Sequence, residues 1–164
     1  SNNYGPYQFP EKLIPLIIVR LLAGEPLPVY GDGRNVRDWL YVGDHCAGID
    51  LVLREASPGT TYNIGGGTEL ENIELVRRLC AIADEEFALD AALRSRFPRC
   101  PAASAKPCIS LLTYVKDRAG HDRRYAIDSS KIERELGYAA RTELSSGLRQ
   151  TFRWYLANEA WWRR

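Results

Sequence analysis

The sequence predicts an α/β protein that is built from short strands. Short runs of β-branched and aromatic residues alternate along the chain with amphipathic helical patterns. Hydrophobic residues make up 45% of the 164 residues, which is enough for a packed core. The strand-like runs are too few and too short for a complete parallel sheet, because the strands of such sheets are long and apolar throughout.

The first third of the chain predicts two helices and two extended segments. Leu13 to Ala23 carries a helical apolar pattern, and Gly24 is placed to end that helix. Pro28 to Tyr30 is a short extended segment followed by a glycine-rich turn. Arg37 to Val42 alternates in strand fashion, and a helix with an aspartate as its cap follows over Asp44 to Glu55.

The middle of the chain predicts a strand, a helix and a less patterned stretch. Thr60 to Ile64 is β-branched and aromatic, which favours a strand, and Gly65 to Gly67 forms the loop after it. Thr68 to Glu71 has the spacing of a capping box before a helix through Ala83. The stretch from Ala91 to Ser110 has the weakest pattern, and we interpret it as a loop or an insertion.

The last third predicts two extended pieces and two helices. Leu111 to Val115 and Arg124 to Ile127 are short extended pieces. Asp128 is placed to cap a helix over Ser129 to Leu136. The final helix opens at Thr142 and runs to about Ala157, and the tryptophans near the end of the chain are expected to cover apolar core or interface.

Composition excludes several classes of protein. The formal net charge of +1 argues against a nucleic-acid binder, which would show an excess of basic residues. No run approaches the roughly 18 apolar residues that a membrane span needs. The first residues are polar and carry no basic segment, so we do not expect them to form a signal peptide. We therefore expect a small-molecule ligand, with no nucleic acid and no membrane as partner.

The four cysteines do not predict a metal site. No pair forms C-x-x-C, and the chain has only two histidines. Cys46 and Cys80 lie in apolar helical patterns and are interpreted as core thiols. Cys100 and Cys108 lie in the weakly patterned stretch and have the option of pairing. Nothing else indicates an oxidising compartment, so we expect reduced thiols and a cytoplasmic protein.

Three residues in the first quarter of the chain are candidates for ligand binding. The carboxamides of Asn2 and Asn3 both donate and accept, which suits sugar hydroxyls or an amide-bearing cofactor. A polar turn is the alternative. Arg37 follows a glycine-rich turn, and its planar fork of donors suits a phosphate. A surface ion pair with Asp38 is the alternative there.

Three further features each have a functional and a structural interpretation. The run from Asp117 to Arg124 gathers three arginines and a histidine around one glycine, which suits a diphosphate, although a solvated charged turn is the alternative. Gly65 to Gly67 is favoured as a close-packing loop over a phosphate cradle, because the chain contains no G-x-G-x-x-G. His45 is interpreted as a packed or capping residue rather than an acid or base.

One catalytic arrangement is absent from the sequence. No tyrosine is followed four residues later by a lysine. The chain therefore lacks a tyrosine and lysine pair in which the ammonium lowers the phenol pKa for proton abstraction.

Five segments taken in order carry a more specific pattern. They are SNNYGPYQFPEKLIP (1–15), PVYGDGRNVRDWLYV (28–42), YNIGG (62–66), DRAGHDRRYAID (117–128) and WYLANEAWW (154–162). This series resembles the dTDP-glucose 4,6-dehydratase family of the extended short-chain dehydrogenase/reductase superfamily. The resemblance spans nearly the whole chain but only the C-terminal half of the family, whose N-terminal Rossmann half would lie before Ser1.

The resemblance implies what the parent protein does. Residues 1–164 would be a nucleotide-sugar-binding C-terminal portion, with short segments that complete the missing Rossmann half. The parent would convert dTDP-glucose to dTDP-4-keto-6-deoxyglucose with NAD, bound mainly by the missing half, as a homodimer in deoxysugar biosynthesis. The isolated chain would hold no catalytic residue, show no turnover and expose apolar surface. The alternatives are a non-catalytic binding or structural module, or part of a UDP-sugar epimerase or decarboxylase.

The resemblance also implies a set of binding residues and their roles. Asn3 would contact the nicotinamide side of NAD, the loop over 117–121 would close over the nucleotide, and His45 would have no role. Ala119 departs from the proline that the family often has, and the stretch over 91–110 is longer than usual. The implied substrate-binding residues are Asn2, Lys12, Leu13, Pro28, Val29, Tyr30, Arg37, Asn72, Asp117, Arg118, Ala119, Gly120 and His121.

Overall fold

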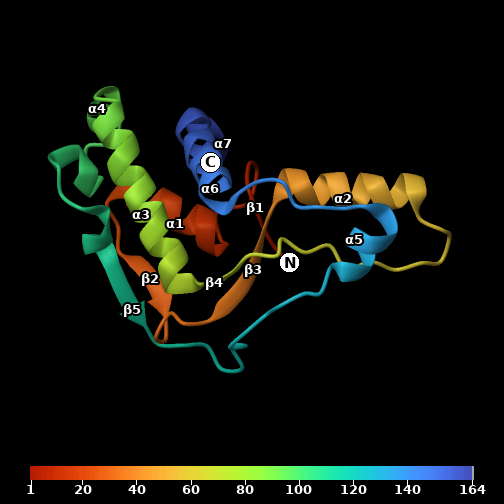
Figure 1. Cartoon of the computed structure of the whole chain (residues 1–164). Coiled ribbons are helices and arrows are strands. Elements are labelled where there is room, and N and C mark those ends of the chain that lie inside the picture. The colour runs from red at the N-terminus through yellow and green to blue at the C-terminus, as the bar shows by residue number, and fades with distance from the viewer. Residues whose placement is uncertain (164) are drawn as a thin grey trace.

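The computed structural model describes residues 1–163 and has the predicted mixture of helices and short strands (Figure 1). The strands are β1 (Asn2–Tyr4), β2 (Leu27–Tyr30), β3 (Val36–Tyr41), β4 (Glu69–Glu71) and β5 (Leu112–Val115). The helices are α1 (Leu13–Ala23), α2 (Val42–Glu55), α3 (Asn72–Leu89), α4 (Ala92–Arg96), α5 (Ser130–Leu136), α6 (Leu144–Ala157) and α7 (Glu159–Trp162).

The strands form two small sheets. In the first, β3 lies between β1, to which it is parallel, and β4, to which it is antiparallel. Asn2 stands opposite Trp39 in this register. In the second sheet, β2 pairs in parallel with β5, and Leu27 stands opposite Leu112. Neither sheet is a complete parallel sheet, as the short strand-like runs predict.

The core lies among helices α1, α3 and α6 (Figure 1). Ile17 and Ile18 of α1, Leu79 of α3, and Leu148 and Phe152 of α6 are all fully buried. Burial of a large apolar side chain stabilises a fold by about 1.5–3 kcal/mol, so this helical layer holds the two sheets in place.

Several elements form where the sequence predicts them. Helix α1 has the predicted bounds, and Gly24 ends it with φ 68°, a backbone conformation that glycine adopts without steric cost. Strand β2 includes the extended segment at Pro28, β3 is shifted by one residue from its expected range, and β5 starts one residue later than expected. Cys80 is buried, as expected for a core thiol.

Two predicted helix starts are wrong for a shared reason. Helix α2 begins at Val42, and Asp44 does not cap it. The Asp44 carboxylate instead accepts a hydrogen bond from the backbone N–H of Thr142, at 2.8 Å. Helix α6 therefore begins at Leu144, and the carboxylate of Glu143 caps it by accepting from Ser146 N–H. A long-range contact thus takes both residues away from their expected local roles.

The segment before α3 also differs from prediction. Thr60 to Ile64 forms no strand, because it is held to the region of α5 by side-chain contacts such as Lys131 Nζ to Thr61 O, at 2.9 Å. Glu69–Glu71 pairs with β3 as β4 instead of forming a capping box. The helix then starts at Asn72 and continues to Leu89, beyond the predicted end at Ala83.

The weakly patterned stretch over 91–110 is ordered and packed. It contains α4 and two 3-10 turns, Pro101–Ser104 and Cys108–Leu111. Cys100 and Cys108 are buried free thiols whose sulfur atoms are 3.8 Å apart.

Toward the other end of the chain, Arg124 to Ile127 makes only an isolated bridge to Val36 rather than a strand.

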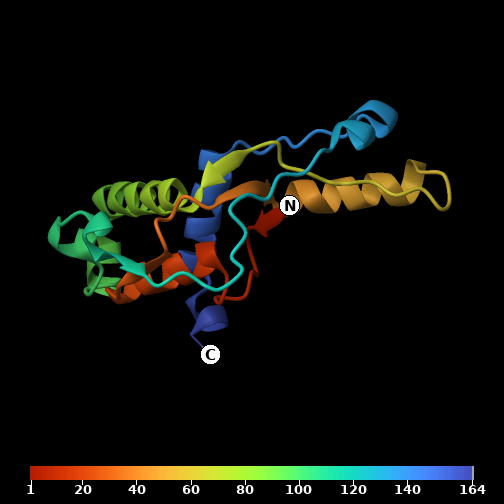
Figure 2. The same cartoon turned by 90° about the horizontal axis from the view of Figure 1, so that it is seen from below.

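Helix α2 projects from the rest of the molecule beside α5 (Figure 2). Gly48 is its only buried residue, while Cys46, Ile49 and Leu53 are exposed. The expectation that Cys46 is a core thiol is therefore wrong, because Cys46 lies on the side of α2 that is exposed in residues 1–163. No helix in the described part of the chain is long and apolar enough to cross a membrane.

Candidate functional site

A cleft of about 530 Å³ opens between α1, the strands β1 to β3 and the loop over residues 116–124. It collects segments from the beginning, middle and later part of the chain. Ten of the fourteen residues predicted for the site line it: Asn2, Asn3, Lys12, Leu13, Pro28, Tyr30, Arg37, Asn72, Arg118 and His121.

Arg37 of β3 is a buried cation on the wall of this cleft. Its side chain donates to two carbonyl oxygens, Val36 O at 2.7 Å and Asp122 O at 2.9 Å, and lies 4.8 Å from the Tyr125 ring centroid. It forms no ion pair with a carboxylate anywhere in residues 1–163. Burial lowers the pKa of Arg37 from its ordinary value. A buried charge normally has a counter-charge, so this guanidinium is suited to an anionic ligand.

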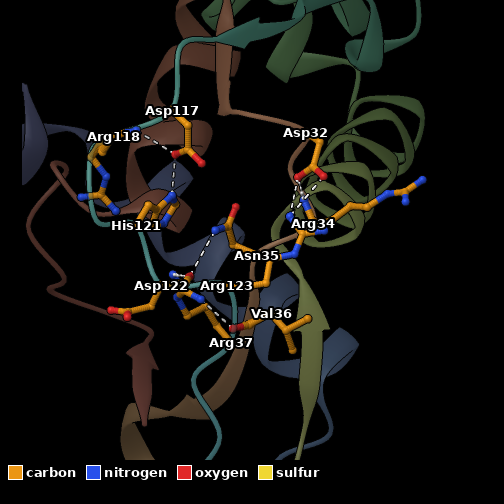
Figure 3. Close-up of polar contacts among 10 residues, drawn as sticks. All are labelled: Asp32, Arg34, Asn35, Val36, Arg37, Asp117, Arg118, His121, Asp122 and Arg123. Atoms are coloured by element: carbon orange, nitrogen blue, oxygen red, sulfur yellow. Dashed lines mark hydrogen bonds and ion pairs between the residues drawn. The ribbon is translucent and has the colours of Figure 1, made fainter.

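The loop over 116–124 is fastened to the start of β3 (Figure 3). The Asp122 carbonyl accepts from Asn35 Nδ2 at 3.1 Å and from Arg37. Val36 N–H donates to Arg123 O at 2.8 Å, and the Arg123 guanidinium binds both carboxylate oxygens of Asp32. These contacts hold the loop against the cleft.

Inside this loop, His121 and Arg118 are directed to the cleft. Asp117 Oδ1 lies 2.6 Å from His121 Nδ1 and also accepts from the Arg118 backbone N–H. The guanidinium carbon of Arg118 lies 5.4 Å from the Tyr30 ring centroid, and the His121 ring meets the same tyrosine edge-on. Asp117 therefore holds the His121 ring and the Arg118 backbone in place beside Tyr30.

The basic run in this loop does not act as one cluster. Arg123 pairs with Asp32, and Arg124 makes a two-pronged contact with Glu69, at 2.7 and 2.8 Å. Only Arg118 of the three arginines lines the cleft. Two of the three arginines thus have carboxylate partners, which agrees for Arg123 and Arg124 with the alternative of a charged turn.

The structure bears on the alternative interpretations of Arg37, the triple glycine and His45. Arg37 and Asp38 do not form a surface pair, since both are buried and Asp38 accepts from the backbone N–H groups of Gly66 and Thr68. Gly66 packs directly against the β3 backbone, which supports the close-packing interpretation of the triple glycine. His45 lies on α2, outside the residues that line the cleft.

Four predicted site residues do not line the main cleft. Val29 is 2% exposed and belongs to the hydrophobic core. Ala119 and Gly120 line an adjoining hollow of about 410 Å³. Asp117 lies behind the cleft, where it contacts the His121 ring and accepts from the Arg118 backbone N–H.

The structure adds Trp39 and Gln8, which the sequence did not predict for the site. Both line the cleft, and each has a buried polar atom, Trp39 Nε1 and Gln8 Oε1, without a hydrogen-bond partner in the described chain. Asn3 Oδ1 and Asn72 Oδ1 share this property. Trp39 follows Arg37 by two residues on a strand, so both side chains lie on one face. This spacing is the signal in the sequence that could have indicated Trp39 as a site residue. Gln8 had no comparable indication.

We predict that the anchoring of this loop depends on pH. The His121 contact, with the Arg118 N–H, lowers the pKa of Asp117, and Arg123, with the Arg34 N–H, lowers the pKa of Asp32. For a carboxyl whose folded pKa is depressed, the stabilisation is complete above the unfolded pKa of about 3.9 and is lost as pH falls through the folded pKa.

Hydrogen exchange of the peptide over 116–124, corrected for intrinsic rates, should show constant protection at pH 5 to 7. Protection should fall as the pH is lowered below the unfolded pKa of about 3.9 and toward the depressed folded pKa values. Asp117→Asn should bring the low-pH exchange of the loop to neutral pH. Protection that stays unchanged between pH 6 and pH 2.5 would contradict this role of the two carboxylates.

Comparison with known proteins shows which family this chain is similar to. A family model described as GDP-mannose 4,6-dehydratase matches residues 1–151. A dTDP-glucose 4,6-dehydratase of Xanthomonas campestris is 52% identical over 161 residues, which are 98% of this chain and 42% of the relative. The chain thus spans less than half the length of this curated relative.

Solved structures show the same pattern of similarity. The crystal structure of dTDP-glucose 4,6-dehydratase from Bacillus anthracis in complex with NAD has a TM-score of 0.81 and 42% identity, covering 99% of this chain and 44% of that one. The crystal structure of UDP-glucose 4-epimerase from Thermotoga maritima with UDP-glucose has a TM-score of 0.76 and 25% identity. The match covers 96% of this chain and 44% of the epimerase.

Proposed function

Because the chain belongs to the GDP-mannose 4,6-dehydratase family, we propose that it is the sugar-nucleotide-binding part of a dTDP-glucose 4,6-dehydratase. The observation that carries the proposal is the buried Arg37 guanidinium, which has no carboxylate partner in residues 1–163 and faces the cleft. Support for the dTDP-sugar comes from 42% identity to a dTDP-glucose dehydratase, against 25% to a UDP-glucose epimerase.

The cleft offers a different chemistry to each part of such a ligand. Tyr30 has an exposed aromatic face. Together with Pro28 and Leu13 it provides an apolar wall that suits the nucleobase of the ligand. Arg37 and Arg118 supply charged donors that suit the two phosphates. We assign the carboxamide of Asn2, which lines the same cleft beside β3, to sugar hydroxyls.

The residues present fit a small part of an NAD molecule. Asn3 Oδ1 is buried without a hydrogen-bond partner among the described residues, so it suits the carboxamide N–H of a nicotinamide. The sequence contains no G-x-G-x-x-G to hold the pyrophosphate of a dinucleotide. We therefore assign most NAD contacts to other parts of the parent protein. Bound NAD would supply hydride transfer.

In the parent we propose the NAD-dependent conversion of dTDP-glucose to dTDP-4-keto-6-deoxyglucose. This chain binds and orients the substrate, and the proton transfers belong to residues outside it, since it has no Tyr-x-x-x-Lys pair. The unpartnered apolar face of α2 supports packing against further protein. A homodimeric parent and a cytoplasmic location are parts of the same proposal, and the free thiols agree with that location.

Calorimetric titration of the protein with dTDP-glucose and UDP-glucose tests the proposal. We expect dTDP-glucose to bind at least about tenfold more tightly, because a pocket shaped for an extra methyl group discriminates by roughly 1–3 kcal/mol. Tighter binding of UDP-glucose would favour the second candidate, part of a UDP-sugar epimerase, which the Thermotoga similarity supports. Binding of neither ligand would overturn the sugar-nucleotide site and leave a structural module.

A further inference from the structure

The indole N–H of Trp39 is a buried donor that has no acceptor. The Trp39 side chain is 6% exposed and packs in the hydrophobic core, yet the residue also lines the cleft. Its Nε1 finds no hydrogen-bond partner in residues 1–163. Trp162 shows the usual outcome, since its Nε1 donates to Tyr155 O at 2.8 Å. Buried polar groups are nearly always hydrogen-bonded, so the orphaned Trp39 donor indicates an absent partner.

The position of Trp39 on β3 indicates which part of a bound ligand would lie beside its indole N–H. Arg37 and Trp39 are two residues apart on one strand, so their side chains lie on the same face. Trp39 is the further of the two from the turn that joins β2 to β3, and it stands opposite Asn2 of β1. If Arg37 binds the diphosphate, Trp39 lies on the side of it away from Tyr30, where the sugar would be.

The same cleft holds a complementary acceptor. Gln8 Nε2 donates to Asn3 O at 2.8 Å, which orients the Gln8 amide and leaves its Oε1 buried without a partner in the described chain. A sugar hydroxyl both donates and accepts, so it is served by one donor and one acceptor, whereas a phosphate oxygen only accepts. The cleft-lining residues Trp39 and Gln8 thus bring one unpartnered donor and one unpartnered acceptor, and a hydroxyl is the ligand group that can serve either kind.

We propose that Trp39 is a specificity-determining residue whose indole N–H donates a hydrogen bond to a hydroxyl oxygen of the hexosyl group. This inference rests on the proposed function of the cleft. If Trp39 contacts only the hexose, it has no contact with the nucleoside diphosphate. Changing Trp39 then affects the binding of the hexosyl group without affecting the binding of the nucleotide.

The test is Trp39→Phe, titrated calorimetrically with dTDP and with dTDP-glucose. Phenylalanine keeps most of the apolar packing and removes the N–H. We expect dTDP-glucose to bind about three- to tenfold more weakly and dTDP to bind within about twofold of the wild type, as for one neutral hydrogen bond. Trp154→Phe is the matched control, since Trp154 packs against Tyr7 and Trp161 and does not line the cleft. Equal losses for both ligands, or no loss, would overturn the inference.

A second measurement uses the wild-type protein and so does not depend on the folding of the variant. In ¹H–¹⁵N spectra the Trp39 indole resonance, assigned by replacing each of the other three tryptophans with phenylalanine, should move with dTDP-glucose and stay in place with dTDP. A resonance that responds equally to both ligands would overturn the role of Trp39 alone. A wild-type protein that binds neither ligand would overturn the proposed function as well, so the two failures are distinguishable.

Discussion

Replacing Arg37 with alanine is expected to weaken dTDP-glucose binding by about 100-fold. The guanidinium is buried and unpaired by any carboxylate in the described residues, so it is free to contact the ligand phosphates. Hydrogen bonds to charged groups are worth about 1.5–3 kcal/mol, and the upper end corresponds to two orders of magnitude in affinity. Calorimetry with dTDP-glucose and with dTDP measures the loss, which should be similar for both ligands because both carry the diphosphate.

Two control variants separate the ligand contact from the structural role of Arg37. Arg37 also holds Val36 O and Asp122 O, so the alanine variant must be checked by circular dichroism and thermal unfolding. Arg37→Lys keeps the charge without the planar fork and should fall between wild type and alanine. Arg54→Ala, which removes an exposed pair with Asp50 on α2, should bind normally. Unchanged affinity of a folded Arg37→Ala protein would contradict an anion site in this cleft.

Replacing Gly66 with alanine is expected to lower the free energy of unfolding by about 3 kcal/mol. A Cβ at this position would lie 2.1 Å from Trp39 O and 3.2 Å from Leu40 Cα, so it would collide with the backbone of β3. Overpacking usually costs about 1–3 kcal/mol, and a rigid strand backbone places this site at the upper end. The shift would also disturb the bond from Gly66 N–H to Asp38, at 2.8 Å. Urea unfolding measures the effect.

Gly67→Ala is the matched control for this variant. Gly67 has φ 64° and nothing within 4 Å of the added Cβ, so only the left-handed backbone strain of about 1 kcal/mol remains. Weaker ligand binding should accompany Gly66→Ala alone, since β3 carries Arg37. A Gly67→Ala loss equal to or above the Gly66→Ala loss would show that the triple glycine is needed for its backbone conformation rather than for close packing.

The fold could be predicted from sequence where local forces decide it. Helix α1 has a full apolar stripe and a glycine in the left-handed conformation at its end, and both signals lie within one segment. Predictions failed where a distant residue competes for a local group. Asp44 has the chemistry of a cap, yet it accepts from Thr142, which is 98 residues further along the chain. No local pattern contains such a partner.

The residues of the candidate site show the same contrast between local signals, which the sequence contains, and long-range contacts, which it does not. Arg37 was identified from its residue type and the turn before it, and the family resemblance supplied most of the other residues that line the cleft. The sequence leaves the role of the charged loop open because the carboxylate partners of Arg123 and Arg124, Asp32 and Glu69, are brought near only in the folded chain. Trp39 was missed because an unsatisfied donor is a property of three-dimensional packing and has no mark in the sequence.

The attachment of the binding loop to the start of β3 has a consequence for how the protein folds. The Arg123 to Asp32 contact joins residues 91 apart in sequence, and the Arg37 to Asp122 contact joins residues 85 apart. Closing loops of this length costs entropy that is recovered only when both segments are in place, so these contacts form late. A ligand that bridges β3 and the loop stabilises these late contacts by mass action. If the cleft binds the proposed sugar nucleotide, occupancy of the cleft and folding of the chain are thermodynamically linked, and the ligand concentration sets part of the stability of the protein.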